Sequence, residues 1–320
     1  MRYSAQLTRR ILHAYDLDAR QSYAALARKV GPSKDIIRRT ILDFEQDQTI
    51  RGYITVIDIG KLGFTGSAVY ARLDTADQGK QARLLRHLQE RQDIYWVALL
   101  GGRYDILFAI QSSTLVQFSE ILSDIQRRFP FVTNAQFAIR TRATQFQRAY
   151  LSERSAGRVQ GGFEVSDQKQ ILTTREKQIL SLLIEDPRIQ IVELARKAKI
   201  SRITAQSTIE RLRKNGVIQG YSALIDCRKL GLESHLVLVT LKRFDQVTRS
   251  RIRKFAAAES GIIFCIESIG PWQTEFHCEV PSQQELQGLL RRFRSEFPGE
   301  IAGLEVIAGL DYYTKYRYTL

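Results

Sequence analysis

Residues 194–221 read LARKAKISRITAQSTIERLRKNGVIQGY, and this stretch decides how the chain folds. It opens in a short helical pattern, turns tightly, and restarts at Ser201, whose hydroxyl suits the N-cap of a second helix. Ile203, Ile209 and Leu212 recur at helical spacing, which puts apolar side chains on one face. The last residues of the stretch alternate as a strand does. Two helices joined by a tight turn and followed by a strand are typical of a winged helix-turn-helix.

An upstream helix completes this unit, and an α+β pattern follows it. Thr173-Thr174-Arg175-Glu176 has the form of a capping box, and Asp186-Pro187 stops the helix that the box opens. Downstream, apolar runs predict strands and amphipathic patterns predict helices. In chain order these are a strand at 236–241, a helix at 247–258, strands at 262–269 and 274–280, a helix at 282–297 and a strand at 301–308. The order βαββαβ is the ferredoxin-like arrangement.

The same pattern occurs earlier in the chain. Leu26-Ala27-Arg28-Lys29 recurs as Leu194-Ala195-Arg196-Lys197, and the same shift in numbering maps Phe129-Pro130 onto Phe297-Pro298. A constant shift indicates a duplicated module. The predicted fold class is therefore α+β, with two tandem copies of a winged helix-turn-helix followed by a ferredoxin-like βαββαβ domain. The predicted units are 1–55 and 56–150 in the first copy, a flexible Gly/Ser-rich linker at 151–168, and 169–223 and 224–320 in the second copy.

The composition narrows the class of partner. The 320 residues carry a net charge of +14, and the pI is near 9.8, which favours polyanions. The sequence has no run of about 18 apolar residues, so we expect no membrane partner. Three cysteines in so long a chain fit a reducing compartment. We therefore expect a cytoplasmic protein that is associated with the nucleoid.

The helix after each tight turn is the candidate recognition helix. Its outward face would present Ser201, Arg202, Gln206, Ser207 and Arg211 in the second copy, and Lys34, Arg38 and Arg39 in the first. Such charges are also common on ordinary solvated helices. Within a helix-turn-helix of a strongly basic chain, we interpret them as contacts to the base edges or phosphates of double-stranded DNA.

Together these features resemble the Lrp/AsnC (feast/famine) family of prokaryotic transcriptional regulators. The resemblance rests on the helix-turn-helix, on Gly220-Tyr221 in the wing, on Asp226 followed by Lys229-Leu230-Gly231, and on the βαββαβ order. It covers nearly the whole chain twice. It implies a DNA-binding regulator in which the two copies act as a pseudo-dimer and the chains form homo-oligomers. It also implies that the α+β (RAM) domains bind a small effector, an amino acid or related metabolite.

The resemblance places the effector at the glycine-rich turn between the second and third strands of the α+β domain. In the first copy this turn is Gly101, Gly102, Arg103, Tyr104 and Asp105. Exposed backbone amides at a Gly-Gly turn can take a carboxylate, and Asp105 can take an ammonium group. The alternative is a purely structural turn, in which the tyrosine packs and the aspartate holds the backbone.

Each copy departs from the family pattern in a different place. The second copy reads Ile269-Gly270-Pro271-Trp272-Gln273 and lacks the aspartate, and we expect Trp272 to be an aromatic plug. The first copy has Gly31-Pro32-Ser33 at its tight turn, and Asp47-Gln48-Thr49 where the family usually has a glycine. We therefore hypothesise that the first copy keeps the effector chemistry and the second keeps the more regular helix-turn-helix.

We expect no enzymatic activity, no catalytic residues, no metal and no cofactor. Adjacent strand residues point to opposite faces, so His277 and Cys278 do not share one ion easily. Two alternatives stay open. Siroheme decarboxylases of some prokaryotes also look like paired or fused Lrp-type modules, and a nucleoid-associated protein would compact DNA with little sequence preference. The aromatic tail, Tyr312, Tyr313, Tyr316 and Tyr318, is predicted to dock against the body or another subunit rather than stack on nucleic acid.

Overall fold

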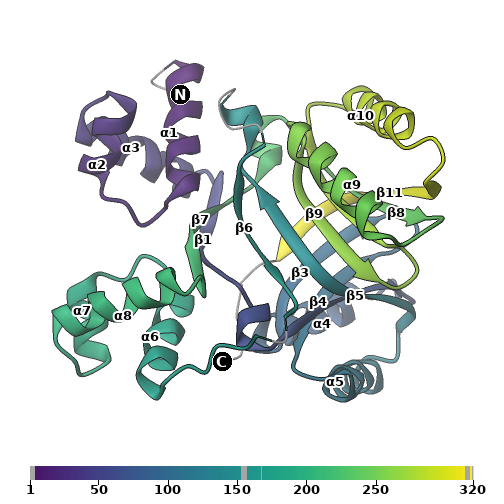
Figure 1. Ribbon diagram of the computed structural model, residues 1–320, viewed down its shortest axis with the longest axis horizontal. Helices are drawn as coiled ribbons and strands as arrows, with labels where there is room; N and C mark the ends of the chain where they lie inside the picture. The colour runs from purple at the N-terminus through teal and green to yellow at the C-terminus, as the bar shows by residue number, and fades with distance from the viewer. Residues whose placement is uncertain (1–3, 153–156, 167, 314–317, 319) are drawn as a thin grey trace.

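A computed structural model describes residues 4–152, 157–166, 168–313, 318 and 320 of the chain. Two helix-turn-helix units lie on one side of a β-barrel (Figure 1). The first copy consists of α1 (Ala5–Leu17), α2 (Tyr23–Val30), α3 (Lys34–Gln46), β1 (Ile50–Ile57), β2 (Thr65–Leu73), α4 (Gln78–Glu90), β3 (Ile94–Gly101), β4 (Ile106–Ser112), α5 (Leu115–Arg128) and β5 (Val132–Phe146), and β6 (Val159–Glu164) follows it.

The second copy repeats this order. It consists of α6 (Thr174–Glu185), α7 (Ile191–Lys197), α8 (Arg202–Lys214), β7 (Ile218–Ile225), β8 (Glu233–Leu241), α9 (Gln246–Ala258), β9 (Ile262–Ile269), β10 (Thr274–Val280), α10 (Gln283–Glu296) and β11 (Ile301–Tyr313). From α3 to α5, each α-helix and strand of the first copy has a counterpart whose two ends are displaced by the same shift that the sequence repeat has. The predicted βαββαβ domains and their duplication are confirmed.

The two α+β domains close into one barrel. The strand order is β2-β4-β3-β11-β8-β10-β9-β5, and a β2–β5 pairing closes the ring. The strands of the two copies meet twice, where β3 pairs with β11 and where β5 pairs with β9. Helices α4 and α5 pack on the outside of the first copy's strands, and α9 and α10 pack on the outside of the second copy's (Figure 1). The barrel interior is a third core, rich in aromatic side chains.

The predicted linker is not uniformly flexible. Residues 159–164 form β6, which pairs antiparallel with β5 and adds a strand beside the barrel. Gly162 has φ 147°, and a Cβ there would lie 1.9 Å from the carbonyl oxygen of Ala143. The glycines that suggest flexibility in the sequence therefore allow close backbone approach in the structure.

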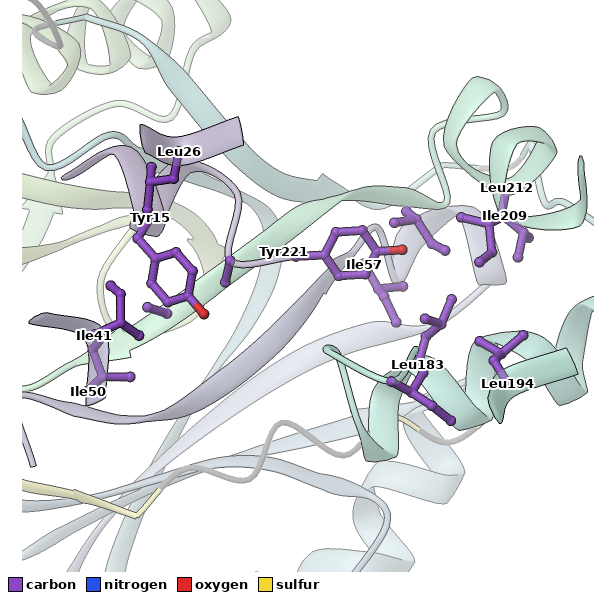
Figure 2. Packing of buried hydrophobic residues seen from close by; sticks show 14 of the residues in the cluster. Tyr15, Leu26, Ile41, Ile50, Ile57, Leu183, Leu194, Ile209, Leu212 and Tyr221 are labelled. Carbon is purple, nitrogen blue, oxygen red and sulfur yellow. The ribbon is translucent and has the colours of Figure 1, made fainter. Parts of the chain in front are cut away.

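The two helix-turn-helix units share one core. β1 pairs antiparallel with β7, with Thr55 opposite Tyr221. Buried side chains of both units then form one cluster, and Figure 2 shows Ile57 and Tyr221 lying between its two halves. Because apolar surface is buried across the pair, separating the units would expose it to water. The sheet and the common core thus hold both units in one relative orientation.

Two arginines fasten the units to each other. Arg188 of the second unit lies over the ring of Tyr53 at 4.7 Å and forms an ion pair with Glu45 at 2.9 Å. Its counterpart in the first unit, Arg20, lies over Tyr221 at 5.3 Å and donates to the carbonyl oxygen of Pro187 at 2.9 Å. Cation–π contacts of this kind contribute about 0.5–2 kcal/mol each. Part of the basic surplus therefore holds the pair together.

Candidate nucleic-acid interface and central cavity

The recognition helices α3 and α8 begin in the same way. The hydroxyl of Ser33 accepts from the backbone N–H of Ile36 at 3.3 Å, and Ser201 accepts from Thr204 at 3.0 Å. These caps satisfy N–H groups that the helix leaves unpaired. Each helix buries one face against its own unit, through Ile37, Ile41 and Phe44 in α3 and through Ala205, Ile209 and Leu212 in α8. The opposite faces are exposed.

Several predicted DNA contacts are available on these faces. Lys34, Arg38, Arg39 and Arg202 are exposed, and none of them forms an ion pair or hydrogen bond within the described part of the chain. Ile203 departs from the prediction. It is 82% exposed beside Arg202 instead of facing the core, because it precedes Leu212 by nine residues and so lies about half a turn around α8 from the buried face. The N-terminal turn of α8 therefore offers a cation and an apolar side chain together.

Other predicted contacts are engaged within the protein. The Arg211 guanidinium donates from Nε to Glu176 at 2.8 Å and so joins α8 to α6. Ser207 donates its hydroxyl to the carbonyl oxygen of Thr204, and Gln206 donates to Glu210 at 3.2 Å. Arg211 thus has a structural partner, whereas Arg38 and Arg39 on α3 have none among the described residues.

The predicted effector turn lies at the end of β3. Gly102 has φ 113°, a conformation that favours glycine, and a Cβ there would meet nothing within 4 Å. Arg103 reaches Glu305 of the second copy at 3.1 Å. Tyr104 is buried in the barrel and donates to Gln136 at 2.6 Å. The Asp105 carboxylate accepts from the backbone N–H of Leu73 at 2.8 Å. The turn is therefore open at Gly102 and packed at Tyr104.

A cavity lies between the wing strands and the barrel. Its walls come from β1 and β7 on the wing side, from β6, and from barrel strands of both copies, including Tyr95, Trp96, Arg140 and His277. The cavity volume is about 170 Å³. The described end of the predicted tail also reaches it, since Tyr312 and Tyr318 are among the lining residues. Docking of the tail against the body is confirmed for these two residues. Tyr316 and the side chain of Tyr313 lie outside the described residues.

A buried polar cluster forms part of the cavity wall. Arg140 is 3% exposed and pairs with Glu275 at 2.9 Å, and it donates to the hydroxyl of Tyr95 at 3.2 Å. The imidazole Nε2 of His277 lies 2.6 Å from the same carboxylate. Burial alone would raise the pKa of Glu275, but Arg140 and then His277 outweigh it and lower the pKa to about 2. Glu275 therefore stays ionised and orients the imidazole.

Aromatic rings cover the rest of the wall. The ring of Trp96 stacks against His277 at 5.1 Å and against Tyr312 at 5.7 Å. Tyr95 stacks against Tyr318 at 6.3 Å with an interplanar angle of 20°. The predicted plug Trp272 lies elsewhere, 3% exposed inside the barrel and edge-on to Tyr70, which agrees with the expected packing role.

The sequence does not predict this cluster. His277 is weighed there only as a metal ligand, and Arg140 and Glu275 have no predicted role. The available signal was charge within strands that otherwise read as buried, such as Glu275 and His277 between the apolar residues of β10. Within the described ranges, no three His, Cys, Asp or Glu side chains gather as metal ligands would. None of the helices described has the length and apolarity that a bilayer crossing requires.

Comparisons with known proteins agree with this architecture. A family model for winged helix-turn-helix DNA binding matches residues 172–219. The HTH-type transcriptional regulator LrpA1 of Halobacterium salinarum is 33% identical over 115 residues, which is 36% of this chain and 80% of the relative. An uncharacterised HTH-type transcriptional regulator of Pyrococcus furiosus is 41% identical over 58 residues, which is 18% of this chain but only 39% of that relative.

One solved structure matches nearly the whole chain. The siroheme decarboxylase NirDL superposes with a TM-score of 0.61 at 14% identity, over 98% of this chain and 93% of that one. Likeness at this identity is a likeness of fold. The prediction that the chain is not an enzyme is nonetheless contradicted, because an enzyme has the same two-module fold. The fold therefore does not separate regulators from enzymes.

The sequence relatives decide the family. The match to LrpA1, at 33% identity, spans 80% of that regulator, and the helix-turn-helix model falls on the second copy of the repeat. The partial length of these matches is what a tandem duplication produces, since each relative aligns with one module. The chain belongs to the Lrp/AsnC family of DNA-binding helix-turn-helix transcriptional regulators, as a fused pair of the family's modules.

Proposed function

We propose that the chain is a sequence-specific regulator whose two copies act as a dimer within one polypeptide. The observation that carries the proposal is the fixed pair of recognition helices. Both α3 and α8 have exposed outer faces, and both belong to units joined by the β1–β7 sheet and one core. A helix-turn-helix dimer reads two half-sites whose spacing mirrors the separation of its recognition helices. One chain supplies both helices.

The two helices are unlike, so the proposed operator is asymmetric. Positions related by the repeat carry Lys34 and Arg202, Arg38 and Gln206, and Arg39 and Ser207. Arginine suits guanine, and glutamine suits adenine. The exposed Ile203 adds an apolar contact of the kind that thymine methyl groups accept. The half-site that α3 contacts and the half-site that α8 contacts should therefore differ in base preference.

The test is selection of bound DNA from genomic fragments at about 150 mM salt with excess competitor. The proposal expects a few retained fragments with two unlike half-sites. A triple variant, Arg202→Lys, Gln206→Arg and Ser207→Arg, gives α8 the residues of α3 at these three positions. It should shift selection toward a more symmetric site, and Lys80→Ala on α4 serves as the control. Retention of all fragments alike would refute sequence specificity and favour a nucleoid role.

We also propose a small-metabolite effector at the Gly101–Asp105 turn of the first copy. The open space at Gly102 supports this placement, because a ligand carboxylate can approach the backbone there. The engagement of Asp105 by Leu73 limits its capacity for a ligand ammonium group. Calorimetric titration with amino acids tests the site, and Asp105→Asn should weaken any binding that uses the carboxylate. Concentration-dependent mass measurement, with and without the amino acid, tests the proposed homo-oligomer.

A second candidate is an enzyme that acts on a tetrapyrrole, as the structurally similar siroheme decarboxylase does. The observation that favours it is His277 in the cavity wall, whose imidazole is held by the buried Glu275 carboxylate, because a carboxylate-held imidazole can move a proton. Pockets for larger ligands measure about 300–1,000 Å³. At about 170 Å³, the cavity would admit a macrocycle only after Tyr318 leaves.

Titration with siroheme, followed by absorption, tests the second candidate. Binding together with release of carbon dioxide would establish it, and His277→Ala should then retain binding and lose turnover. Binding without product in the wild-type chain would reject the enzyme. The exposed Val192→Ala variant is the control for both readouts, since it lies on α7 away from the cavity.

A further inference from the structure

We propose that the cavity binds a planar, uncharged aromatic group, and that this group takes the place of the Tyr318 ring. Its consequence for DNA binding rests on the proposed regulatory function, whereas ligand binding itself does not. The site is distinct from the Gly101–Asp105 turn, and its proposed occupant is smaller than the macrocycle of the second candidate function.

The cavity wall offers aromatic ring faces on which a ligand can stack. Tyr95 presents a ring face that Tyr318 covers at 6.3 Å, and Trp96 lies between two further rings. Tyr318 itself lies outside the strands of the barrel. A stacked aromatic pair contributes about 0.5–1.5 kcal/mol beyond area burial. A ligand ring of similar shape can therefore compete for the face.

The volume of the cavity suits a small aromatic compound. The cavity holds about 170 Å³ with Tyr318 in place. An engineered protein cavity of about 150 Å³ admits benzene. A one- or two-ring aromatic compound therefore fits once the tyrosine ring withdraws. The small side chain of Ala143 contributes to this space, since it lies in the wall and is 8% exposed.

The charges in the cavity wall favour a neutral ligand. Each arginine in the wall is already compensated by a carboxylate of the chain. These pairs are Arg51 with Asp226 and Asp311, Arg140 with Glu275, and Arg148 with Asp16 and Glu279. A buried anion without a partner is unstable, so the enclosed part of the ligand should be neutral. Gln145 is buried in the wall, and its amide makes no hydrogen bond within the described residues, so it can bind one polar atom of the ring.

The cavity also adjoins the two-stranded sheet that joins the DNA-binding units. Val56 of β1 and Leu224 of β7 line the cavity from the two-stranded sheet that joins the recognition units. A ligand larger or smaller than the tyrosine ring would therefore change the packing against the β1–β7 sheet, which sets the separation of α3 and α8. A ligand shifts such an equilibrium only through different affinity for the two arrangements.

The experiment is calorimetric titration of the full-length chain with three probes. Indole is a neutral two-ring compound, indole-3-acetate is the same ring with a carboxylate, and iron uroporphyrin III is a macrocycle. We expect indole to bind at least as tightly as indole-3-acetate. Tyr318→Ala should tighten indole binding about two- to tenfold, since it removes one competing stack. Ala143→Phe should weaken binding at least about tenfold by filling the space.

The controls separate binding from folding and from regulation. Phe244→Ala removes an aromatic side chain from the surface and should leave indole affinity unchanged. Thermal unfolding of Ala143→Phe checks that the variant folds, and Tyr318→Ala gives an independent answer if it does not. Binding of the macrocycle in preference to indole would overturn the proposal of an uncharged ligand, because uroporphyrin carries carboxylates around its ring.

Other outcomes overturn the proposal. If none of the three probes binds either wild type or Tyr318→Ala, the cavity is not an aromatic site. If Tyr318→Ala leaves every affinity unchanged, the displacement is wrong. Indole binding with no change in DNA affinity would reject the regulatory consequence. Indole binding by a chain that binds no DNA would reject the proposed function while leaving the cavity assignment intact.

Discussion

Arg148 joins units that are far apart in the sequence. It follows β5 of the first copy and is 7% exposed. Its guanidinium contacts Asp16 of α1 at 3.0 Å and Glu279 of β10 at 3.1 Å. Ser222 of β7 donates to the same Asp16 carboxylate at 2.8 Å, and Tyr150 donates to Glu279. One buried cation thus connects both helix-turn-helix units with both α+β domains.

Replacing Arg148 by Met should destabilise the protein strongly. Met keeps most of the side-chain volume but leaves Asp16, 0% exposed, and Glu279, 5% exposed, without their cation. Removing one partner of a buried ion pair costs about 3–5 kcal/mol, because the remaining charge is uncompensated. The cost is a large part of the roughly 5–15 kcal/mol that stabilises a typical domain. Urea unfolding at pH 7 measures it as a fall in the free energy of unfolding.

A rescue variant separates charge from packing. Adding Asp16→Asn and Glu279→Gln to Arg148→Met removes the buried charges and should recover most of the loss. The control Arg127→Met removes an 82% exposed arginine, which pairs with Asp124, and should change stability by less than about 1 kcal/mol. If Arg148→Met also costs less than about 1 kcal/mol, the reasoning from buried charge is refuted.

Three further predictions concern other parts of the molecule. The pKa of Glu275 is lowered to about 2 from a usual value of 4.5, so the stabilisation from its pair with Arg140 is present above pH 4.5 and is lost as the pH falls toward 2. Urea midpoints of wild type should fall across that window, and those of Glu275→Gln should fall less, from a lower starting value. For DNA binding, Arg38→Ala should reduce the slope of log affinity against log salt concentration by about 0.9 if Arg38 neutralises one phosphate. The guanidinium of Arg211 is held by Glu176, so Arg211→Ala should leave this slope unchanged. Gly102→Ala should cost about 1 kcal/mol through its φ of 113°, with no clash, and an equal unfolding midpoint would contradict that assignment.

The sequence predicts the elements well because their signals are local. The serine caps, the apolar spacing in the helices and the alternation in the strands each depend on neighbouring residues. The structural repeat follows from one constant shift in the sequence, and every α-helix and strand from α3 to α5 respects it. The recognition faces were predictable for the same reason. Ile203 was mispredicted because its separations from Ile209 and Leu212, six and nine residues, do not match the three- or four-residue repeat of one helix face.

The cavity could not be predicted in this way because distant segments build it. Arg140 and Glu275 are separated by 135 residues and meet only because β5 pairs with β9 of the other copy. Ser222 and Asp16 meet only because β7 of the second unit packs against α1 of the first. Likewise, the glycines of 159–164 suggested a linker, since nothing local shows that Ala143 would approach Gly162.

Fusion of the two modules explains why the cavity is asymmetric. In a homodimer, every substitution appears twice around the symmetry axis. In this chain, the positions equivalent to His277 and Glu275 are Ala109 and Leu107, and the position equivalent to Arg140 is Ala308. A symmetric assembly would bury two such ion pairs, each with its own desolvation cost. A single chain buries one, fills the equivalent positions with apolar side chains, and keeps two unlike recognition helices. The asymmetry of the cavity and that of the proposed operator therefore have one physical origin, the covalent joining of two copies that could then diverge.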